Sequence, residues 1–250
     1  MSGHSKWSSI KHRKAATDAR RGQQFTKLAR AITVAAREGG GDPDGNPVLA
    51  NAVQKARDAS MPKDNIERAI ARGTGEAADA GGIESVVYEA YGPGGAALMI
   101  ETLTDNRNRT GADVRHLLAK HGGTLGEPGS VAYLFEKRGV IVVDAGRYSE
   151  DDLIPAIDAG AQDIGVDEDV YEVVTTPSDL SAVRSALEQA GVELESAELV
   201  QRPATRVHLD RGQAASVLAL IDALEAADDV QAVHSNFDVD AEVMEAIAAS

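Results

Sequence analysis

The apolar residues of the first third of the chain recur every three or four positions, which is the spacing of amphipathic helices. One such run starts at Phe25 and ends at three consecutive glycines. The pair Asn46-Pro47 then has the form of a helix start, because Asn is a good N-cap and Pro fits the first helical position. A third periodic segment begins at Pro62 and ends at Gly73. The pattern predicts a small helical domain with a basic N-terminal arm.

A different pattern begins after segment 74–83, which is small, acidic and glycine-rich, as is typical of a linker. Two short apolar runs, at 86–88 and 97–100, flank the sequence YGPGG and predict two strands joined by a turn. A helix is predicted over about 107–121. A strand is predicted next, at the sequence VAYLF, residues 131–135.

From Gly139 onward the pattern predicts the β-α-β-β-α-β order of a ferredoxin-like unit. The predicted elements are a strand at VIVV, a helix over 149–160, a strand over about 162–167, a strand at VYEVV, a helix over 178–190 and a strand over about 193–200. The last segment adds a strand, a strongly apolar helix and another strand. These are too few to cover their own apolar faces, so we expect them to join the strands of residues 83–135.

The sequence therefore predicts an α+β protein, with an N-terminal helical domain followed by two α+β domains, one inserted in the other. At 250 residues the chain has room for two or three units of about 100 residues each. The expected divisions are 1–80 for the basic arm and helical domain, 81–136 plus 203–240 for a discontinuous middle α+β domain, 137–202 for an inserted ferredoxin-like domain and 241–250 for a C-terminal tail.

Composition excludes several kinds of chemistry. The chain has no cysteine, which removes disulfides, thiol catalysis and Cys-ligated metals. Its six histidines lack metal-site spacing, and the acidic clusters at 150–152 and 227–229 are interpreted as ordinary helix-end acids. The sequence shows neither a nucleophile–base constellation nor a P-loop. We expect no enzyme activity, catalytic residue, metal, cofactor or small-molecule substrate, and no membrane partner, since no apolar run approaches ~18 residues.

Charge is distributed unevenly along the chain. The first 80 residues hold 14 Lys+Arg and 9 Asp+Glu, whereas the rest hold 11 and 31. A basic front on an acidic protein has two interpretations: a solvated helix face, or an attachment surface for a polyanion, because phosphates release counterions when they bind Lys and Arg. The candidate nucleic-acid-binding residues of this region are Lys6, Lys11, His12, Arg13, Lys14, Arg20, Arg21, Lys27 and Arg30.

A second candidate site is the sequence TDNRNRT, residues 104–110, between a predicted strand and a predicted helix. Thr104 or Asp105 is suited to cap that helix, which explains part of the motif structurally. Two Arg and two Asn in adjacent positions are also suited to gripping a phosphate or carboxylate with several donors. The candidate binding residues here are Asn106, Arg107, Asn108 and Arg109.

Several long motifs follow one another in a fixed order. They are GHSKW, KHRKAATDARRGQQFTKLARAITVAAREGGGDPDGNP, MPKDNIERAI, YEAYGPGG, TDNRNRT, GSVAYLF and DDVQAVHSNFD. In these motifs the chain resembles the YebC/PmpR family, whose mitochondrial relatives include the translational activator of cytochrome oxidase subunit I. The resemblance runs from residue 2 to about 238. It implies three domains with a discontinuous middle one, the plan that the hydrophobic pattern also predicts.

The resemblance further implies a non-enzymatic, nucleic-acid-binding regulator of gene expression. The leading hypothesis is a ribosome-associated translation factor that binds ribosomal RNA and relieves stalling at proline-rich sequences. The alternative is a transcriptional regulator that binds DNA through the same basic surface. Because GHSKW lies at the start of the chain, it leaves no room for a transit peptide, and we expect a bacterial, cytoplasmic protein.

The basic arm generates the first prediction. Replacing Lys11, Arg13 and Lys14 together by Glu is expected to weaken nucleic-acid association and leave the fold intact, because these residues precede the first apolar helix. Filter binding and thermal unfolding of the triple variant check this. A loss of thermal stability as large as that of a core variant would contradict it.

Overall fold

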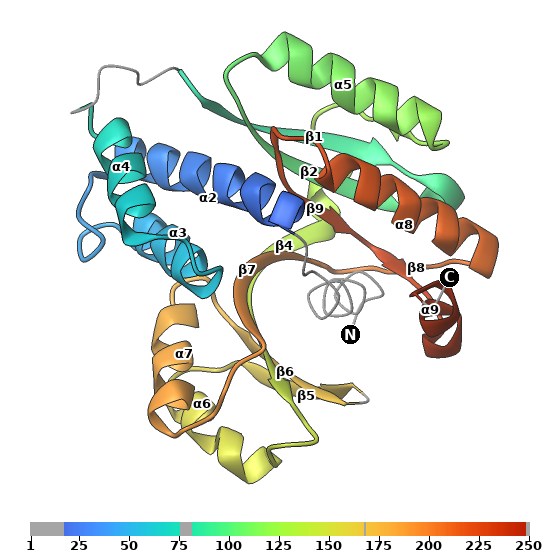
Figure 1. The fold of residues 1–250 in the computed structure, drawn as a ribbon. Helices are drawn as coiled ribbons and strands as arrows, with labels where there is room; N and C mark the ends of the chain where they lie inside the picture. The colour runs from blue at the N-terminus through green and yellow to red at the C-terminus, as the bar shows by residue number, and fades with distance from the viewer. Residues whose placement is uncertain (1–17, 76–81, 168, 249–250) are drawn as a thin grey trace.

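The structure is a computed structural model that describes residues 18–75, 82–167 and 169–248. Its first part consists of helices α2 (Asp18–Gly39), α3 (Pro47–Asp58) and α4 (Lys63–Gly73), which pack around one apolar cluster (Figure 1). The predicted N-cap of α3 is confirmed, because the Asn46 side chain accepts the N–H of Leu49 at 3.1 Å. The same side chain donates to the carbonyls of Ala35 and Gly40 at 2.8 and 2.9 Å. One buried amide thus joins the start of α3 to the end of α2.

The next part is an antiparallel sheet with the strand order β3-β1-β2-β9. Its strands are β1 (Glu84–Tyr91), β2 (Ala97–Thr104), β3 (Thr124–Leu125) and β9 (Val230–Ser235), and a 3-10 turn, η1 (Pro93–Gly95), joins the first two. Strand β9 lies beside β2 although more than 100 residues separate them, with Leu98 opposite Ser235 and Ile100 opposite Val233. The final segment of the chain therefore completes a sheet that begins near residue 84.

Two helices, α5 (Arg107–Lys120) and α8 (Arg211–Glu225), cover one face of this sheet. Both share an apolar cluster with Leu98 and Ile100 of β2. A short parallel pair, β8 (Val207–His208) and β10 (Phe237–Asp238), lies at the edge, followed by α9 (Ala241–Ala248). The turn after β9 thus returns the chain to the same core.

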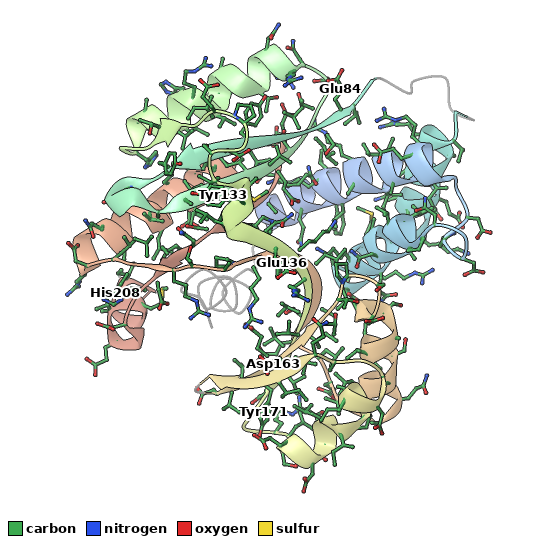
Figure 2. All side chains as sticks on the ribbon, turned by 180° about the vertical axis from the view of Figure 1, so that it is seen from behind. Glu84, Tyr133, Glu136, Asp163, Tyr171 and His208 are labelled. Carbon is green, nitrogen blue, oxygen red and sulfur yellow. The ribbon has the colours of Figure 1, made fainter. Side chains whose placement is uncertain are left out.

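The third part is a sheet with the order β5-β6-β4-β7, and all of its pairs are antiparallel. Its elements are β4 (Phe135–Asp144), a 3-10 turn η3 (Glu150–Leu153), α6 (Ile154–Asp158), β5 (Asp163–Asp167), β6 (Val170–Thr175), α7 (Leu180–Gln189) and β7 (Ser196–Pro203). Figure 2 shows Glu136 near the start of the long strand β4, and Asp163 and Tyr171 toward the far end of the same sheet. The element order confirms the predicted β-α-β-β-α-β unit and, with the leading helices, the α+β class. The exact domain boundaries stay a prediction.

The strand predicted at VAYLF is wrong over most of its length. Residues Ala132–Leu134 form a 3-10 turn, η2, and the strand begins only at Phe135. The cause is Glu89 on β1, whose carboxylate accepts the backbone N–H groups of Gly129, Val131 and Ala132 at 2.6, 2.6 and 2.8 Å. These three donors cannot join a strand ladder, so the loop folds around the carboxylate instead. Burial opposes ionisation of Glu89, but the three hydrogen bonds outweigh it and lower its pKa.

Helices α2 and α4 are in close backbone contact at Gly73. A Cβ at this position would lie 2.3 Å from the carbonyl oxygen of Thr33 and 2.7 Å from Cβ of Ala36. Thr33 itself, buried between the helices, donates its hydroxyl toward the carbonyls of Ala29 and Ala69. The glycine therefore sets the distance between the two helices.

We expect Gly73→Ala to lower the free energy of unfolding by about 1–3 kcal/mol, because the added methyl forces the helices apart. The matched control is Gly22→Ala on the exposed side of α2, where nothing lies within 4 Å of the added Cβ. That variant should gain stability, up to about 1 kcal/mol, from better helix propensity. Urea unfolding of both variants checks the pair, and equal stability of the two would contradict the close packing.

Candidate nucleic-acid interface

The structure places the predicted binding residues in three groups. The arm residues Lys6, Lys11, His12, Arg13 and Lys14 lie outside the described residues. Arg20 and Arg21 belong to the start of α2, and the structure describes their backbone only. The remaining ones, Lys27 and Arg30 on α2 and the TDNRNRT residues before and on α5, are described with their side chains, and their contacts follow.

Lys27 faces the C-terminal end of α8. Its Nζ donates to the carbonyl oxygen of Glu225 at 2.6 Å, and Gln23 Nε2, one turn earlier, donates to the carbonyl of Ala226 at 2.6 Å. The last carbonyls of a helix have no partner within the helix, and a cation is favourable beside them because the helix dipole is negative there. The α2 side chains therefore cap α8 from a different part of the fold.

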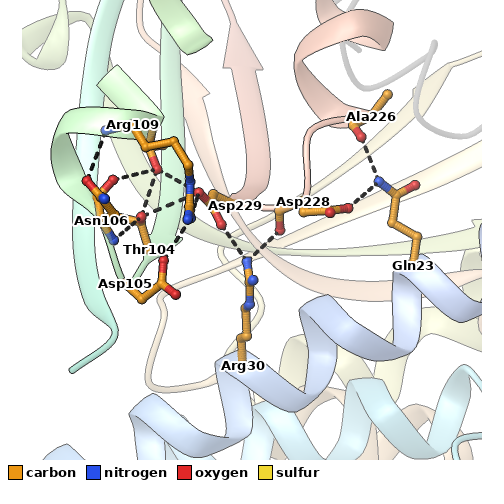
Figure 3. A network of polar contacts seen from close by, with 10 residues as sticks. Gln23, Arg30, Thr104, Asp105, Asn106, Arg109, Ala226, Asp228 and Asp229 are labelled. Atoms are coloured by element: carbon orange, nitrogen blue, oxygen red, sulfur yellow. Dashed lines mark hydrogen bonds and ion pairs between the residues drawn. The ribbon is translucent and has the colours of Figure 1, made fainter. Parts of the chain in front are cut away.

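Arg30 points to the turn between α8 and β9. Its Nη1 donates to the carbonyl of Asp228 at 3.0 Å and forms an ion pair with Oδ1 of Asp229 at 2.7 Å. Figure 3 shows that this carboxylate also meets Arg109 from α5, whose Nη2 lies 2.8 Å from Oδ2 of Asp229. Only 10% of the Asp229 side chain is exposed. One nearly buried carboxylate therefore lies between two guanidinium groups from separate parts of the chain.

The surroundings of Asp229 favour its ionised form. Burial alone would raise the pKa of this carboxyl group, but hydrogen bonds from Thr110, Arg109 and Arg30 outweigh burial and hold the pKa below its ordinary value. The Thr110 hydroxyl makes the shortest of these contacts, with Oγ1 2.6 Å from Oδ2 of Asp229. The group is therefore charged at neutral pH, and it holds two cations in place.

The TDNRNRT motif builds the other side of this network. Asn106 is the N-cap of α5, since its side chain accepts the N–H of Arg109 at 3.1 Å, so the expected cap at Thr104 or Asp105 is wrong. Thr104 instead supports the cap, because its Oγ1 accepts the N–H of Asn106 at 2.9 Å and lies 2.7 Å from Oγ1 of Thr110. Asp105 makes a second ion pair with Arg109 at 2.7 Å. Much of the motif thus joins α5 to the α8–β9 turn.

Arg107 and Asn108 are exposed like Asp105 and Arg109, but within the described residues their side chains take no part in this network. The carbonyl of Arg107 accepts the hydroxyl of Tyr88 at 3.1 Å. Burial raises the pKa of Tyr88, and the positive charges of Arg107 and Arg115 oppose the rise while Asp229 adds to it.

Two further junctions join the parts of the fold. Arg184 on α7 binds Asp58 at the end of α3 through two hydrogen bonds of 3.0 and 3.1 Å, and Lys55 lies 3.5 Å from Glu198. Near β2 and β9, the amide of Gln201 on β7 lies 3.3 Å from Oε1 of Glu101. The helical part thus forms ion pairs with both of the other parts.

Glu101 is the most perturbed carboxyl group of the junction near β7. Its Oε1 lies 3.6 Å from Nε2 of His234, whose side chain is only 8% exposed. The hydrogen bond from His234 is the main reason why the pKa of Glu101 falls to about 2, although burial opposes the shift. This pair joins two neighbouring strands of the middle sheet beside the inserted unit, and the sequence pattern gave no indication of it.

Among the residues that the structure describes, no group of three His, Asp or Glu side chains could hold a metal ion. Within the same residues, no helix is both long enough and apolar enough to span a bilayer. The fold and its junctions define a three-part α+β protein whose basic helices are joined to the middle part through a shared carboxylate and to the inserted part through two ion pairs.

Two family models match the chain. The model described as the TACO1/YebC protein N-terminal domain matches residues 5–76, and that of the TACO1/YebC second and third domain matches residues 83–237. The chain belongs to the TACO1/YebC family.

Relatives from two bacteria are called probable transcriptional regulatory proteins. The one from Rubrobacter xylanophilus is 57% identical over 99% of this chain and 100% of its own length, and the one from Acidothermus cellulolyticus is 54% identical over 96% and 97%. A crystal structure of a conserved hypothetical protein from Aquifex aeolicus is 46% identical, with a TM-score of 0.80 over 89% of this chain and 92% of that one. The described fold is therefore that of the family.

We expect Asp229→Asn to lower the free energy of unfolding at pH 7 by about 2–4 kcal/mol, because two guanidinium groups lose their shared charge. The folded-state pKa of Asp229 lies below the unfolded value, so its stabilisation is complete above the unfolded value and is lost as the pH falls through the folded one. The stability difference between wild type and variant should thus be constant from about pH 5 to 8 and shrink below about pH 4.

Chemical unfolding at a series of pH values measures this difference. Asp228→Asn is the matched control, because Asp228 is exposed and, within the described residues, its carboxylate accepts one hydrogen bond, from Gln23 at 3.0 Å. A control variant as unstable as Asp229→Asn, or a difference that persists undiminished in acid, would show that Asp229 is not the centre of the junction.

Proposed function

We propose that this protein is a non-enzymatic, nucleic-acid-binding regulator of gene expression that acts in the cytoplasm as a ribosome-associated translation factor and relieves stalling at proline-rich sequences. The observation that carries the proposal is the segregation of charge, with 14 basic and 9 acidic residues before residue 81 against 11 and 31 after it. Such a front attaches to phosphates while the acidic remainder is repelled by them. Membership of the TACO1/YebC family supports the same class.

The contacts of the described residues refine which groups would meet RNA. Lys27 and Arg30 already donate to backbone and side-chain oxygens of the α8–β9 turn. The groups that we expect to contact phosphates are therefore the basic residues of the arm and exposed cations such as Arg107, together with the adjacent Asn108. Because residues 81–250 carry 31 acidic against 11 basic side chains, only an approach that presents the basic groups is favourable. A ribosome, on which RNA and protein surfaces alternate, suits such a molecule better than uniform duplex DNA.

The second candidate is a DNA-binding transcriptional regulator. The names of the relatives from Rubrobacter xylanophilus and Acidothermus cellulolyticus favour it, since both are called probable transcriptional regulatory proteins. The same exposed cations would contact the DNA backbone, and the affinity would fall steeply with salt in this case as well. Specific recognition of a promoter would set this candidate apart from the first.

Sedimentation with ribosomes and toeprinting on a message with a proline run test the proposal. We expect the protein to co-sediment and to reduce the toeprint at the proline run, and the variant with Glu at 11, 13 and 14 to do both less well. If the protein neither co-sediments nor changes the stall, yet binds a promoter fragment well above random DNA at physiological salt, the transcriptional candidate replaces it. Affinity that does not change with salt would contradict phosphate binding in both.

A further inference from the structure

A groove of about 250 Å³ runs between α2 and α4, on the helical part of the molecule. Its lining consists of Phe25, Thr26, Ala29, Thr33, Met61, Asn65, Arg68, Ala69 and Arg72. All nine residues are neutral or basic. The groove therefore combines an apolar floor with a positive rim, a combination that suits an anion carrying a flat apolar group.

The floor of the groove is mostly apolar, and its polar side chain, Thr33, already has hydrogen-bond partners. Met61 and Ala69 are buried members of the apolar cluster of the helical part, and Ala29 packs against them. Thr33 is the polar residue beneath them, and its hydroxyl is already used by the carbonyls of Ala29 and Ala69 at 2.9 and 3.1 Å. An apolar ring can thus lie on this floor without separating a buried polar group from its partner.

The rim carries two arginines of like charge. Arg68 and Arg72 are four residues apart on α4, so their side chains are neighbours on one helix face, where like charges repel. Arg68 is held along the helix by hydrogen bonds from Nε to the carbonyl of Asp64 at 3.1 Å and from Nη2 to Asn65. Neither arginine has an ion pair with an acid in the described residues. An external phosphate would supply the missing negative charge, and guanidinium groups bind phosphate through several donors.

The junction with the middle part leaves the groove open. Gln23, Lys27 and Arg30 form one stripe of α2, toward the α8–β9 turn. Thr26, Ala29 and Thr33 form another stripe, which at 100° per residue is centred about a quarter turn around the helix from the first. One helix thus fastens the helical part with one face and lines the groove with a different one.

We propose that this groove binds one nucleotide of single-stranded RNA, with the base on the apolar floor and its phosphate held by Arg68 and Arg72. The proposal rests on the proposed function and names a site within it. The volume lies just below the ~300–1,000 Å³ of sites for drug-sized ligands, so the groove takes one splayed base but no duplex. An acidic peptide would satisfy the arginines but brings no ring for the floor, and stacking or apolar contact with bases is the usual mode for single strands.

The test compares salt dependence between two variants of the full chain, using fluorescence anisotropy with a short fluorescein-labelled oligouridylate. In Arg68→Ala/Arg72→Ala, the contact with one phosphate is lost, and the slope of log Kobs against log salt should become shallower by about 0.7. Arg57→Ala is the matched control, because Arg57 is an exposed cation of α3 outside the groove lining. An equal change of slope in both variants would overturn the site.

A third variant, Ala29→Met, tests the floor. The longer side chain fills the groove and favours the helix, so it should weaken oligouridylate binding while the salt slope and the thermal stability stay as in wild type. Unchanged affinity in this variant would contradict the proposal that the base lies on the floor of the groove. Competition by polyglutamate as effective as that by unlabelled oligouridylate would assign the groove to an acidic peptide instead.

The outcomes separate the site from the proposed function. If the wild-type protein and both groove variants bind the oligouridylate equally well, the groove is not the nucleotide site, but RNA binding by the protein still holds. If wild type binds neither the oligouridylate nor ribosomes, the proposed function fails and the nucleotide site fails with it. Loss of binding in the two groove variants with retention in Arg57→Ala supports the site.

Discussion

The carboxylate of Asp229 is the interaction on which the arrangement of the parts depends. A charged group that is only 10% exposed is costly unless it is paired and hydrogen-bonded. Its partners come from α2, through Arg30, and from α5, through Arg109 and Thr110. Both guanidinium groups share this one carboxylate, so the helical part, helix α5 and the α8–β9 turn hold their positions together. The other junctions are weaker, because ion pairs such as that between Asp58 and Arg184 are partly exposed and worth about 0–1 kcal/mol each.

These internal contacts reduce the number of basic side chains in residues 1–80 that a nucleic acid can reach. Counting Lys and Arg overstates the surface that a polyanion can reach, since Lys27 and Arg30 already bind oxygens of the same chain. The acidic parts thus have two roles: they hold the helical part through some of its cations, and they confine a nucleic acid to the cations that remain. Salt weakens both sets of contacts, but it acts less on the nearly buried Asp229 than on exposed pairs.

Local patterns predicted the helices and strands well, and long-range contacts account for most of what they missed. Periodicity and capping residues indicated α3 and its N-cap Asn46, because these signals lie within a few residues of each other. The sequence VAYLF has strand composition, yet a carboxylate on β1 takes its backbone donors. Asp229 was interpreted as an ordinary helix-end acid, and nothing near it in the sequence sets it apart from Asp228. Its partner Arg30 is 199 residues away, a contact that no local pattern encodes.

The capping of α8 by α2 also has a consequence for the order of assembly during synthesis. The bonds from Gln23 and Lys27 to the end of α8 span 203 and 198 residues. Because a chain emerges from its N-terminus, α2 is complete long before the carbonyls that it caps have been made. The face of α2 that carries Gln23 and Lys27 therefore stays uncovered until nearly the whole polypeptide has been synthesised. Its final docking is a late event, and a chain truncated before residue 225 would keep the polar face of α2 permanently bare.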